Sequence, residues 1–415
     1  MKKSMEEKKK MPQIRFNGFN DDWEQLKLGE LSSSFEYGLN AAAKEYDGKN
    51  KYIRITDIDD DSRKFKQEDI TSPDTDLSSA ENYRLSEGDI LFTRTGASVG
   101  KSYIYKASDG LVYYAGFLIR AKIKKDYNPE FVFQNTLTND YEKFIKITSM
   151  RSGQPGVNAQ EYSQYQIMMP CKIEQDRISG YLRRLDNLIT LHQHKCDQLR
   201  NLKKAMLKKM FPQDGVSIPE LRFIGFTDTW EQRKLGEIVG IYDGVHQTPK
   251  YQDSGIMFLS VENISTLQST KYISEEDFKR DYKVYPQEND ILMTRIGDVG
   301  TTNVVTDNTL KAYYVSLALL KYKNTNPYFL SNAMQSNYVQ KGLANRTLKT
   351  AVPMKINKDE IGKVDVILTA AVEEQSKIGS YFKNLDNLIT LHQRKLEKLK
   401  VIKKSLLSKM FVDAD

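Results

Sequence analysis

The stretch that most resembles a catalytic motif is GASVGKS, at residues 96–102. It follows an apolar run and ends in Gly-Lys-Ser, as a phosphate-binding loop does. That loop needs four residues between its two glycines so that backbone N–H groups surround the phosphate, and here there are three. The next residues, Tyr103-Ile104-Tyr105, are typical of a strand and not of the helix whose N-terminus would hold an anion. We therefore predict a tight turn between two strands.

Other catalytic motifs are incomplete. Asn326-Pro327-Tyr328 is similar to the Asn-Pro-Pro-Tyr/Phe loop of adenine methyltransferases, but it lacks the second proline, and no glycine-rich strand–turn–helix for a methyl donor precedes it. The two cysteines, Cys171 and Cys196, form no CxxC or Cys/His set, so no metal site is expected. Two thiols in so long a chain favour a reducing cytoplasm. The pattern favours recognition over catalysis.

Polar side chains that could contact DNA gather in loops that recur in the two halves of the chain. Residues 37–44 and 242–251 hold equivalent places, and so do 151–158 and 346–353. Asn and Gln can bind adenine edges, Arg can bind guanine, and Lys suits phosphate. The predicted DNA-contacting residues are Tyr37, Asn40, Lys44, Arg54, Arg94, Lys101, Arg151, Gln154 and Asn158 in the first half, and Tyr242, His246, Lys250, Tyr251, Arg295, Arg346 and Lys349 in the second. The alternative is that these loops are solvated turns.

A long duplication must position these loops. The segment from Met11 to Glu30 returns in outline as the segment from Ile218 to Glu237, and residues 185–193 recur identically at 385–393. A repeat of this length is a duplicated module and not a solenoid. It implies approximate two-fold symmetry within one chain, which suits a ligand with two-fold character such as DNA.

Two segments, 173–210 and 373–410, are helical in composition and carry matching heptads. The predicted seam residues are Leu185, Ile189, His192 and Leu199 in the first helix, and Leu385, Ile389, His392 and Leu399 in the second. We interpret the histidines as polar seam residues that fix register. Each helix should be roughly 57 Å long. We expect the apolar seam of each helix to be buried by the other helix, in an antiparallel coiled coil. The alternative is that each helix packs on its own domain.

The predicted fold class is α+β, with two strand-rich globular domains separated by the two long helices in a pseudo-two-fold repeat. The predicted boundaries are a disordered basic tail at 1–10, a first domain at 11–172, a helix at 173–211, a linker at 212–221, a second domain at 222–372 and a helix at 373–412.

Charge is distributed unevenly along the chain. The net charge is +7, yet the two helices and the first ten residues are strongly basic, so the globular parts are acidic overall. A nucleic-acid face on them must therefore be a local patch. The acidic balance is the best support for an alternative function, a coiled-coil scaffold that does not bind DNA. No apolar run is long enough to span a membrane.

The duplicated order resembles the specificity subunit of type I restriction–modification systems. The resemblance covers residues 11–412. It rests on the openings at Trp23 and Trp230, on the Asp-Ile-Leu…Thr-Arg-x-Gly strands at 88–96 and 289–297, and on the paired helices that end Lys-Met-Phe.

This resemblance implies two target-recognition domains, each reading one half of a bipartite, asymmetric site in double-stranded DNA, with the helices setting the spacer. It implies a non-catalytic bacterial protein of the cytoplasm. Its partners would be two methyltransferase subunits that modify adenine N6 and, in the full complex, two restriction subunits. S-adenosylmethionine, ATP and Mg would bind those partners and not this chain. The alternatives remain the scaffold and, with less support, a stand-alone nucleotide-binding enzyme that uses the 96–102 stretch.

Overall fold

The computed structural model describes residues 11–150, 153–214 and 216–414. The predicted tail at 1–10 and the predicted contact residue Arg151 lie outside the described residues. The chain forms two compact units: unit 1 comprises Met1–Gln193 and Arg394–Asp415, and unit 2 comprises His194–Gln393. Each unit thus contains one strand-rich domain together with segments of both long helices.

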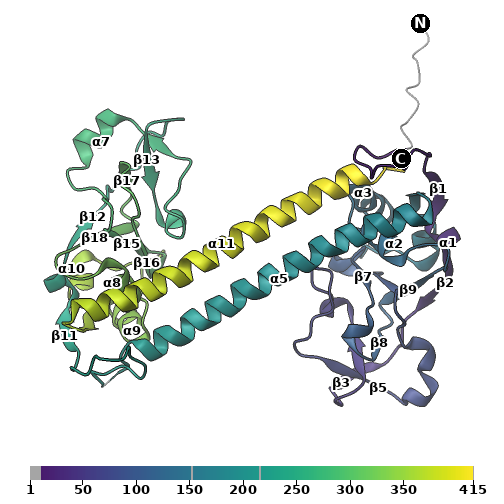
Figure 1. Cartoon of the computed structure of the whole chain (residues 1–415), viewed down its shortest axis with the longest axis horizontal. Coiled ribbons are helices and arrows are strands. Elements are labelled where there is room, and N and C mark those ends of the chain that lie inside the picture. The colour runs from purple at the N-terminus through teal and green to yellow at the C-terminus, as the bar shows by residue number, and fades with distance from the viewer. Residues whose placement is uncertain (1–10, 151–152, 215, 415) are drawn as a thin grey trace, which may run out of the picture. The chain divides into compact units, whose positions relative to one another are not determined.

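The domain of unit 1 is built around two four-stranded sheets (Figure 1). The first has the order β2 (Ser32–Tyr37), β9 (Leu118–Ile123), β6 (Ile90–Thr93) and β7 (Ser102–Ile104). The second has the order β3 (Ala42–Glu45), β5 (Thr71–Asp74), β4 (Lys51–Ile53) and β8 (Val112–Tyr114). A separate pair joins β1 (Glu24–Lys27) to β10 (Gln166–Met169). The helices are α1 (Leu28–Leu31), α2 (Pro129–Asn135), α3 (Asn139–Thr148) and α4 (Ala159–Ser163).

The domain of unit 2 repeats this plan with a smaller second sheet. Its four-stranded sheet has the order β12 (Val239–Asp243), β18 (Leu317–Tyr322), β15 (Ile291–Ile296) and β16 (Asp298–Val304). A three-stranded sheet has the order β14 (Tyr272–Ile273), β13 (Ile256–Leu259) and β17 (Lys311–Tyr313), and β11 (Glu231–Lys234) pairs with β19 (Asp365–Leu368). The helices are α6 (Leu235–Ile238), α7 (Glu275–Asp281), α8 (Pro327–Met334), α9 (Asn337–Arg346) and α10 (Lys358–Gly362).

The two long helices, α5 (Lys172–Met210) and α11 (Val372–Met410), have 39 residues each. In unit 2 they run antiparallel, since Arg200 bonds to Gln393 while Lys203 bonds to Asp386. The predicted α+β fold with an antiparallel helix pair is therefore confirmed.

The seam of the helix pair combines apolar residues with a histidine and a Lys–Asp ion pair in each unit. Leu185 is buried in the core of unit 1 and Leu385 in that of unit 2, and both lie on the predicted heptad. The other predicted seam residues, Ile189, His192, Leu199, Ile389, His392 and Leu399, are partly buried. An ion pair of 2.6 Å joins Lys203 to Asp386 in unit 2, and a matching pair of 2.6 Å joins Lys403 to Asp186 in unit 1.

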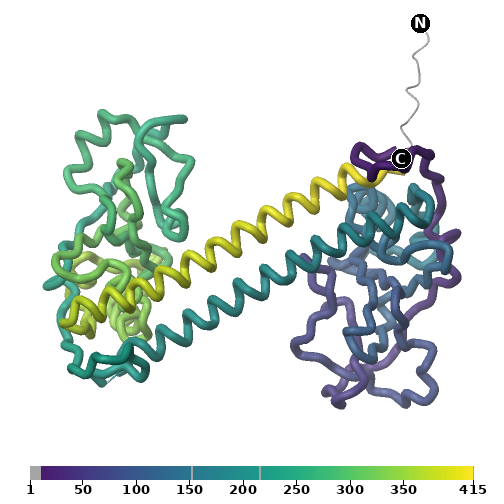
Figure 2. Tube along the Cα trace, in the orientation of Figure 1, coloured from purple at the N-terminus to yellow at the C-terminus, as the bar shows by residue number. Residues whose placement is uncertain are grey.

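Each long helix begins in the core of its own domain and ends in the core of the other repeat. Leu182 near the start of α5 belongs to the core of unit 1, whereas Phe211, directly after α5, packs against Phe329 in unit 2 with 5.5 Å between ring centroids. Phe411, directly after α11, packs in the same way on Phe131 in unit 1, at 5.1 Å. Figure 2 shows the first described residues of the chain beside this end of α11, where the Ile14 N–H donates to the Lys409 carbonyl at 2.9 Å.

A buried ion pair fixes the start of each long helix to its domain. Arg15 donates two hydrogen bonds of 2.8 Å to Glu174 in unit 1, and Arg222 donates bonds of 2.6 and 2.9 Å to Glu374 in unit 2. Both carboxylates are fully buried. Because the same pair recurs at the same place, we interpret it as part of the scaffold that the repeats share.

The two Asn-Pro sequences begin helices at the same place in each domain. Asn128 caps α2 and Asn326 caps α8, and a proline occupies the first turn of each helix. No helix within the described ranges is long and apolar enough to cross a membrane.

Candidate nucleic-acid interface

In unit 1 the end of the central strand β6 meets the loop at residues 153–158. The Val157 N–H donates to the Arg94 carbonyl at 2.9 Å, and the Gly96 N–H donates to the Pro155 carbonyl at 3.0 Å. Gly96 has a φ of +76°, a conformation that favours glycine, so the chain can turn sharply here. The two backbone bonds fix the main chain at Arg94 and Gly96, and the side-chain amide of the exposed Gln154 lies close to Gly96.

Unit 2 contains the same backbone frame at the end of β15. The Ile356 N–H donates to the Arg295 carbonyl at 3.0 Å, and the Gly297 N–H donates to the Met354 carbonyl at 2.8 Å. Gly297 also has a positive φ, of +81°. The loop at residues 347–355 thus corresponds to the described residues 149–150 and 153–156 in unit 1. We call each frame, with the residues it holds, the strand-end frame.

The structural register corrects the pairing of loops expected from the sequence. The Gly96–Pro155 and Gly297–Met354 bonds make Asn158 equivalent to Asn357. The expectation from the sequence, that residues 151–158 are equivalent to 346–353, would make Asn158 equivalent to Pro353. These two asparagines begin α4 and α10, respectively.

The alignment of strand β2 with strand β12 also differs by one residue from the alignment expected from the sequence. Tyr37 pairs with Ile119 on β9, and Asp243 pairs with Ala318 on β18. Because Ile119 and Ala318 hold the same place in the two sheets, Tyr37 corresponds to Asp243 and not to Tyr242, the first residue of the equivalent segment. The segments at 37–44 and 242–251, expected to be loops, are loops only in part: each begins inside its strand, and residues 42–44 lie on β3. The two segments therefore differ in alignment and in structure as well as in sequence.

The arginine of the strand-end frame has a different partner in each unit. In unit 1 the Arg94 guanidinium lies 5.0 Å from the centre of the Tyr37 ring, and the Tyr37 hydroxyl accepts a hydrogen bond of 3.2 Å from the Ala159 N–H. In unit 2 Arg295 forms an ion pair with Asp243. Arg94 is partly exposed, but Arg295 is only 5% exposed, and burial lowers the pKa of Arg295 below its ordinary value.

The apparent phosphate loop is a tight turn, as predicted. Gly96–Ser98 forms a single 3₁₀ turn between β6 and β7. The Lys101 side chain is buried; its ammonium donates to the Ile58 carbonyl at 3.1 Å and lies 2.5 Å from the Asp60 carboxylate. Because this buried cation already has partners, we do not propose Lys101 as a DNA contact.

Several other predicted contact residues have a partner within their own domain. Ion pairs join Lys44 to Asp74 at 3.6 Å, Arg54 to Asp57 at 2.8 Å and Arg346 to Glu360 at 3.2 Å. Asn158 caps α4 by accepting a bond of 2.9 Å from the Glu161 N–H. Tyr251 packs against Phe258, with 5.5 Å between ring centroids.

Five further predicted residues lie at the surface, and none of them has such an ion pair or ring contact within the described ranges. Asn40, Tyr242, His246, Lys250 and Lys349 are exposed. Of the predicted residues that the structure describes, Tyr37, Arg94, Gln154 and Asn158 are brought together at one strand-end frame, that of unit 1.

Exposed apolar side chains that are not among the predicted contact residues lie close to both frames. Phe117 is 60% exposed, and its carbonyl accepts a 3.1 Å bond from the Arg94 N–H. In unit 2 Val352 is 98% exposed, beside the exposed Leu348 and Met354. An aromatic residue directly after Gly116, in a turn between two apolar runs, was the available signal for Phe117.

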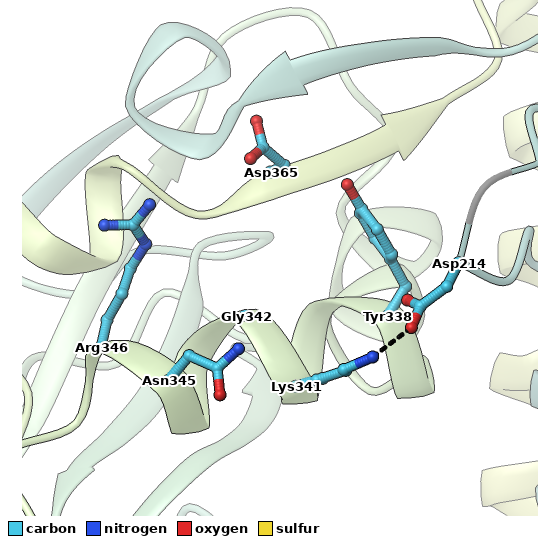
Figure 3. Close-up of a pocket in the computed structure, with 7 residues that line it drawn as sticks. All are labelled: Asp214, Tyr338, Lys341, Gly342, Asn345, Arg346 and Asp365. Carbon is cyan, nitrogen blue, oxygen red and sulfur yellow. Dashed lines mark hydrogen bonds and ion pairs between the residues drawn. The ribbon is translucent and has the colours of Figure 1, made fainter.

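A polar hollow of about 470 Å³ lies in unit 2 between α9, β19 and Asp214 (Figure 3). It is lined by Asp214, Tyr338, Lys341, Gly342, Asn345, Arg346 and Asp365. Lys341 forms an ion pair with Asp214, and Lys234 forms one of 2.6 Å with Asp365. Since Arg346 is also paired, these charges largely neutralise one another. Among the described residues no group of His, Cys, Asp and Glu could hold a metal ion.

Relatives with the same organisation are found among known proteins. The chain is 22% identical over 408 residues to the specificity subunit of the type I restriction enzyme MjaVIII from Methanocaldococcus jannaschii, with 94% of this chain and 92% of the relative covered. A specificity subunit named for the type I restriction enzyme MjaX of the same organism is also 22% identical, over 425 residues, with the same coverage of 94% and 92%.

The fold also matches a crystal structure, that of the S subunit of a type I restriction–modification system from M. genitalium, with a TM-score of 0.69. The two proteins are 14% identical, and the match covers 97% of this chain and 99% of that one. The model of the type I restriction modification DNA specificity domain matches twice, at residues 20–201 and 227–401. The chain therefore belongs to the type I restriction modification DNA specificity domain family and contains two copies of its domain.

Proposed function

We propose that this chain is the DNA-reading subunit of a type I restriction–modification complex and that each unit reads one half of a bipartite, asymmetric site. The observation that carries this proposal is the repeated strand-end frame. The backbone bonds around Arg94 and Arg295 match, whereas the side chains and loops that surround them differ. A shared scaffold with two different sets of exposed side chains suits the reading of two different half-sites.

The two long helices would set the distance between the half-sites and carry the partner subunits. Their seam is occupied by the facing helix, yet Leu188, Leu191, Leu388 and Leu391 are between 43% and 53% exposed. These leucines hold matching positions in the two repeats. Exposed apolar residues that recur in this way support the docking of two equivalent partners, which we propose to be two methyltransferase subunits.

On this proposal the chain itself is not catalytic. S-adenosylmethionine would bind the methyltransferase subunits, which modify adenine N6, while ATP and Mg would serve two restriction subunits in the full complex. The neutralised hollow in unit 2 and the buried, paired Lys101 support this division of labour, because neither offers a free cation to a nucleotide phosphate.

A footprint of the assembled complex on DNA tests the proposal. The chain with its methyltransferase partner should protect two short segments separated by a constant gap, and protection should be weaker without that partner. Exchange of the first domain for that of another family member should change one protected half-site only. A protein that acts only as a scaffold would protect no defined sequence, and that result would reject DNA reading.

A further inference from the structure

We propose that Arg94 reads a guanine in the half-site of unit 1, whereas Arg295, its counterpart in unit 2, is a positioning residue that does not contact DNA. The inference rests on the proposed function and adds to it a base type and a difference between the two units.

The two arginines hold the same place in the backbone. The Arg94 N–H donates to the Phe117 carbonyl at 3.1 Å, and the Arg295 N–H donates to the Ser316 carbonyl at 2.9 Å. Their carbonyls accept the matching bonds of the strand-end frames described above. Any difference in what the two side chains do must therefore come from their surroundings and not from the path of the chain.

The Arg94 guanidinium lies over an aromatic ring and keeps its N–H donors available. Its guanidinium lies over the Tyr37 ring, and in the part of the chain that the structure describes no hydrogen bond or ion pair engages its N–H groups. Tyr37 is 44% exposed, and its hydroxyl is fixed by the Ala159 N–H at the start of α4. The ring thus provides an anchored platform at the surface.

A stacked guanidinium keeps its planar edge of N–H donors available, and this edge matches the O6 and N7 acceptors of guanine in the major groove. A phosphate could be bound by a mobile lysine as a point charge, and it would not need an oriented plane. The fixed platform under Arg94 is therefore better explained by the reading of a base edge.

The Arg295 side chain is buried and already has a partner. Its side chain is 6% exposed, and Asp243, which takes the place of Tyr37, forms its ion pair. To reach a base, Arg295 would have to leave this partly buried carboxylate unpaired, which is costly. The pair instead joins β15 to the end of β12 and so supports the loop that carries the exposed residues of unit 2.

The test uses the chain assembled with its methyltransferase partner and a library of duplexes with randomised half-sites, sequenced after modification. Arg94→Ala should reduce the preference for guanine at one position of one half-site by roughly 10- to 100-fold and leave the other half-site unchanged. Arg94→Lys should relax the same position, because it keeps the charge but loses the planar fork. Arg84→Ala is the matched control, since Arg84 is an exposed arginine of the same unit that pairs with Glu81.

Several results would overturn the inference. If Arg94→Lys behaves as the unaltered chain, or if Arg94→Ala weakens binding equally on all sequences, Arg94 contacts phosphate. The paired variant Arg295→Met/Asp243→Asn removes both charges and should leave both half-sites unchanged; an altered second half-site would show that Arg295 reads DNA. The proposed function fails separately, if the unaltered complex selects no bipartite sequence at all.

Discussion

The substitution Arg222→Met should destabilise unit 2 strongly, because it leaves the Glu374 carboxylate buried without its cation. The Glu374 side chain is 0% exposed and accepts two short hydrogen bonds from Arg222. Removal of one partner of a buried pair costs about 3–5 kcal/mol, more than the modest contribution of the pair itself. Replacement of both residues removes the unpaired charge, so Arg222→Met/Glu374→Met should lie within about 1 kcal/mol of the unaltered chain.

Hydrogen exchange measured by mass spectrometry in increasing urea is a suitable assay, because it reports the opening of each unit separately. The loss of protection should be confined to unit 2 for Arg222→Met and to unit 1 for Arg15→Met, which disrupts the equivalent pair with Glu174. Arg233→Met serves as a control because Arg233 and Glu237 are about half exposed, and surface pairs contribute about 0–1 kcal/mol. A cost below about 1 kcal/mol for Arg222→Met, or a double variant as unstable as the single one, would refute this reasoning.

Three further predictions concern the length of the helices, the Lys203–Asp386 ion pair and the titration of Glu374. Insertion of seven residues after position 193 in α5 and after position 393 in α11 preserves the heptad and lengthens each helix by about 10 Å. The DNA spacer should then grow by about 3 base pairs. An unchanged spacer in a modification map would show that the helices do not set it. The charge reversal Lys203→Glu should weaken the helix pair and lower the stability of the chain. The double variant Lys203→Glu/Asp386→Lys should restore part of that stability, and thermal unfolding of the two variants can measure it. If the double variant were no more stable than the single one, the 2.6 Å contact would contribute nothing to stability. Burial acts to raise the pKa of Glu374, but the hydrogen bonds from Arg222, Thr369 and Trp230, together with the charge of Arg222, outweigh it and hold this pKa below its ordinary value. The stabilisation by Glu374 is therefore fully present above about pH 4.3 and is lost as the pH falls through the lowered pKa. Urea unfolding between pH 3 and 6 should show that loss in the unaltered chain and not in Glu374→Gln.

Periodic patterns in the sequence predict the scaffold well. The heptad at Leu185 and Leu385 indicates a buried helix seam, and the structure buries both residues. The short spacing of the glycines at 96 and 100 indicates a turn, and a 3₁₀ turn is present. These features depend on local geometry, which neighbouring residues determine.

The candidate site depends on contacts between distant segments, and for this reason the sequence predicts it only in part. Residue types alone grouped Arg94 with Arg295, but the residue that faces each arginine comes from another strand. A shift of one residue in the alignment gives Asp243, and not Tyr242, as the partner of Arg295. Lys101 has the character of a surface cation, yet Asp60 and the Ile58 carbonyl hold it in the interior. The sequence pattern could identify the loops but could not distinguish the free side chains from the paired ones.

The most direct test of the central claim is a map of modified adenines in cellular DNA, with and without this chain beside its methyltransferase partner. The account predicts one asymmetric motif in two parts with a fixed spacer, present only with the chain. It also predicts that exchange of the first domain alters one part and leaves the other unchanged. A continuous motif, or a map that is the same without the chain, would contradict the account.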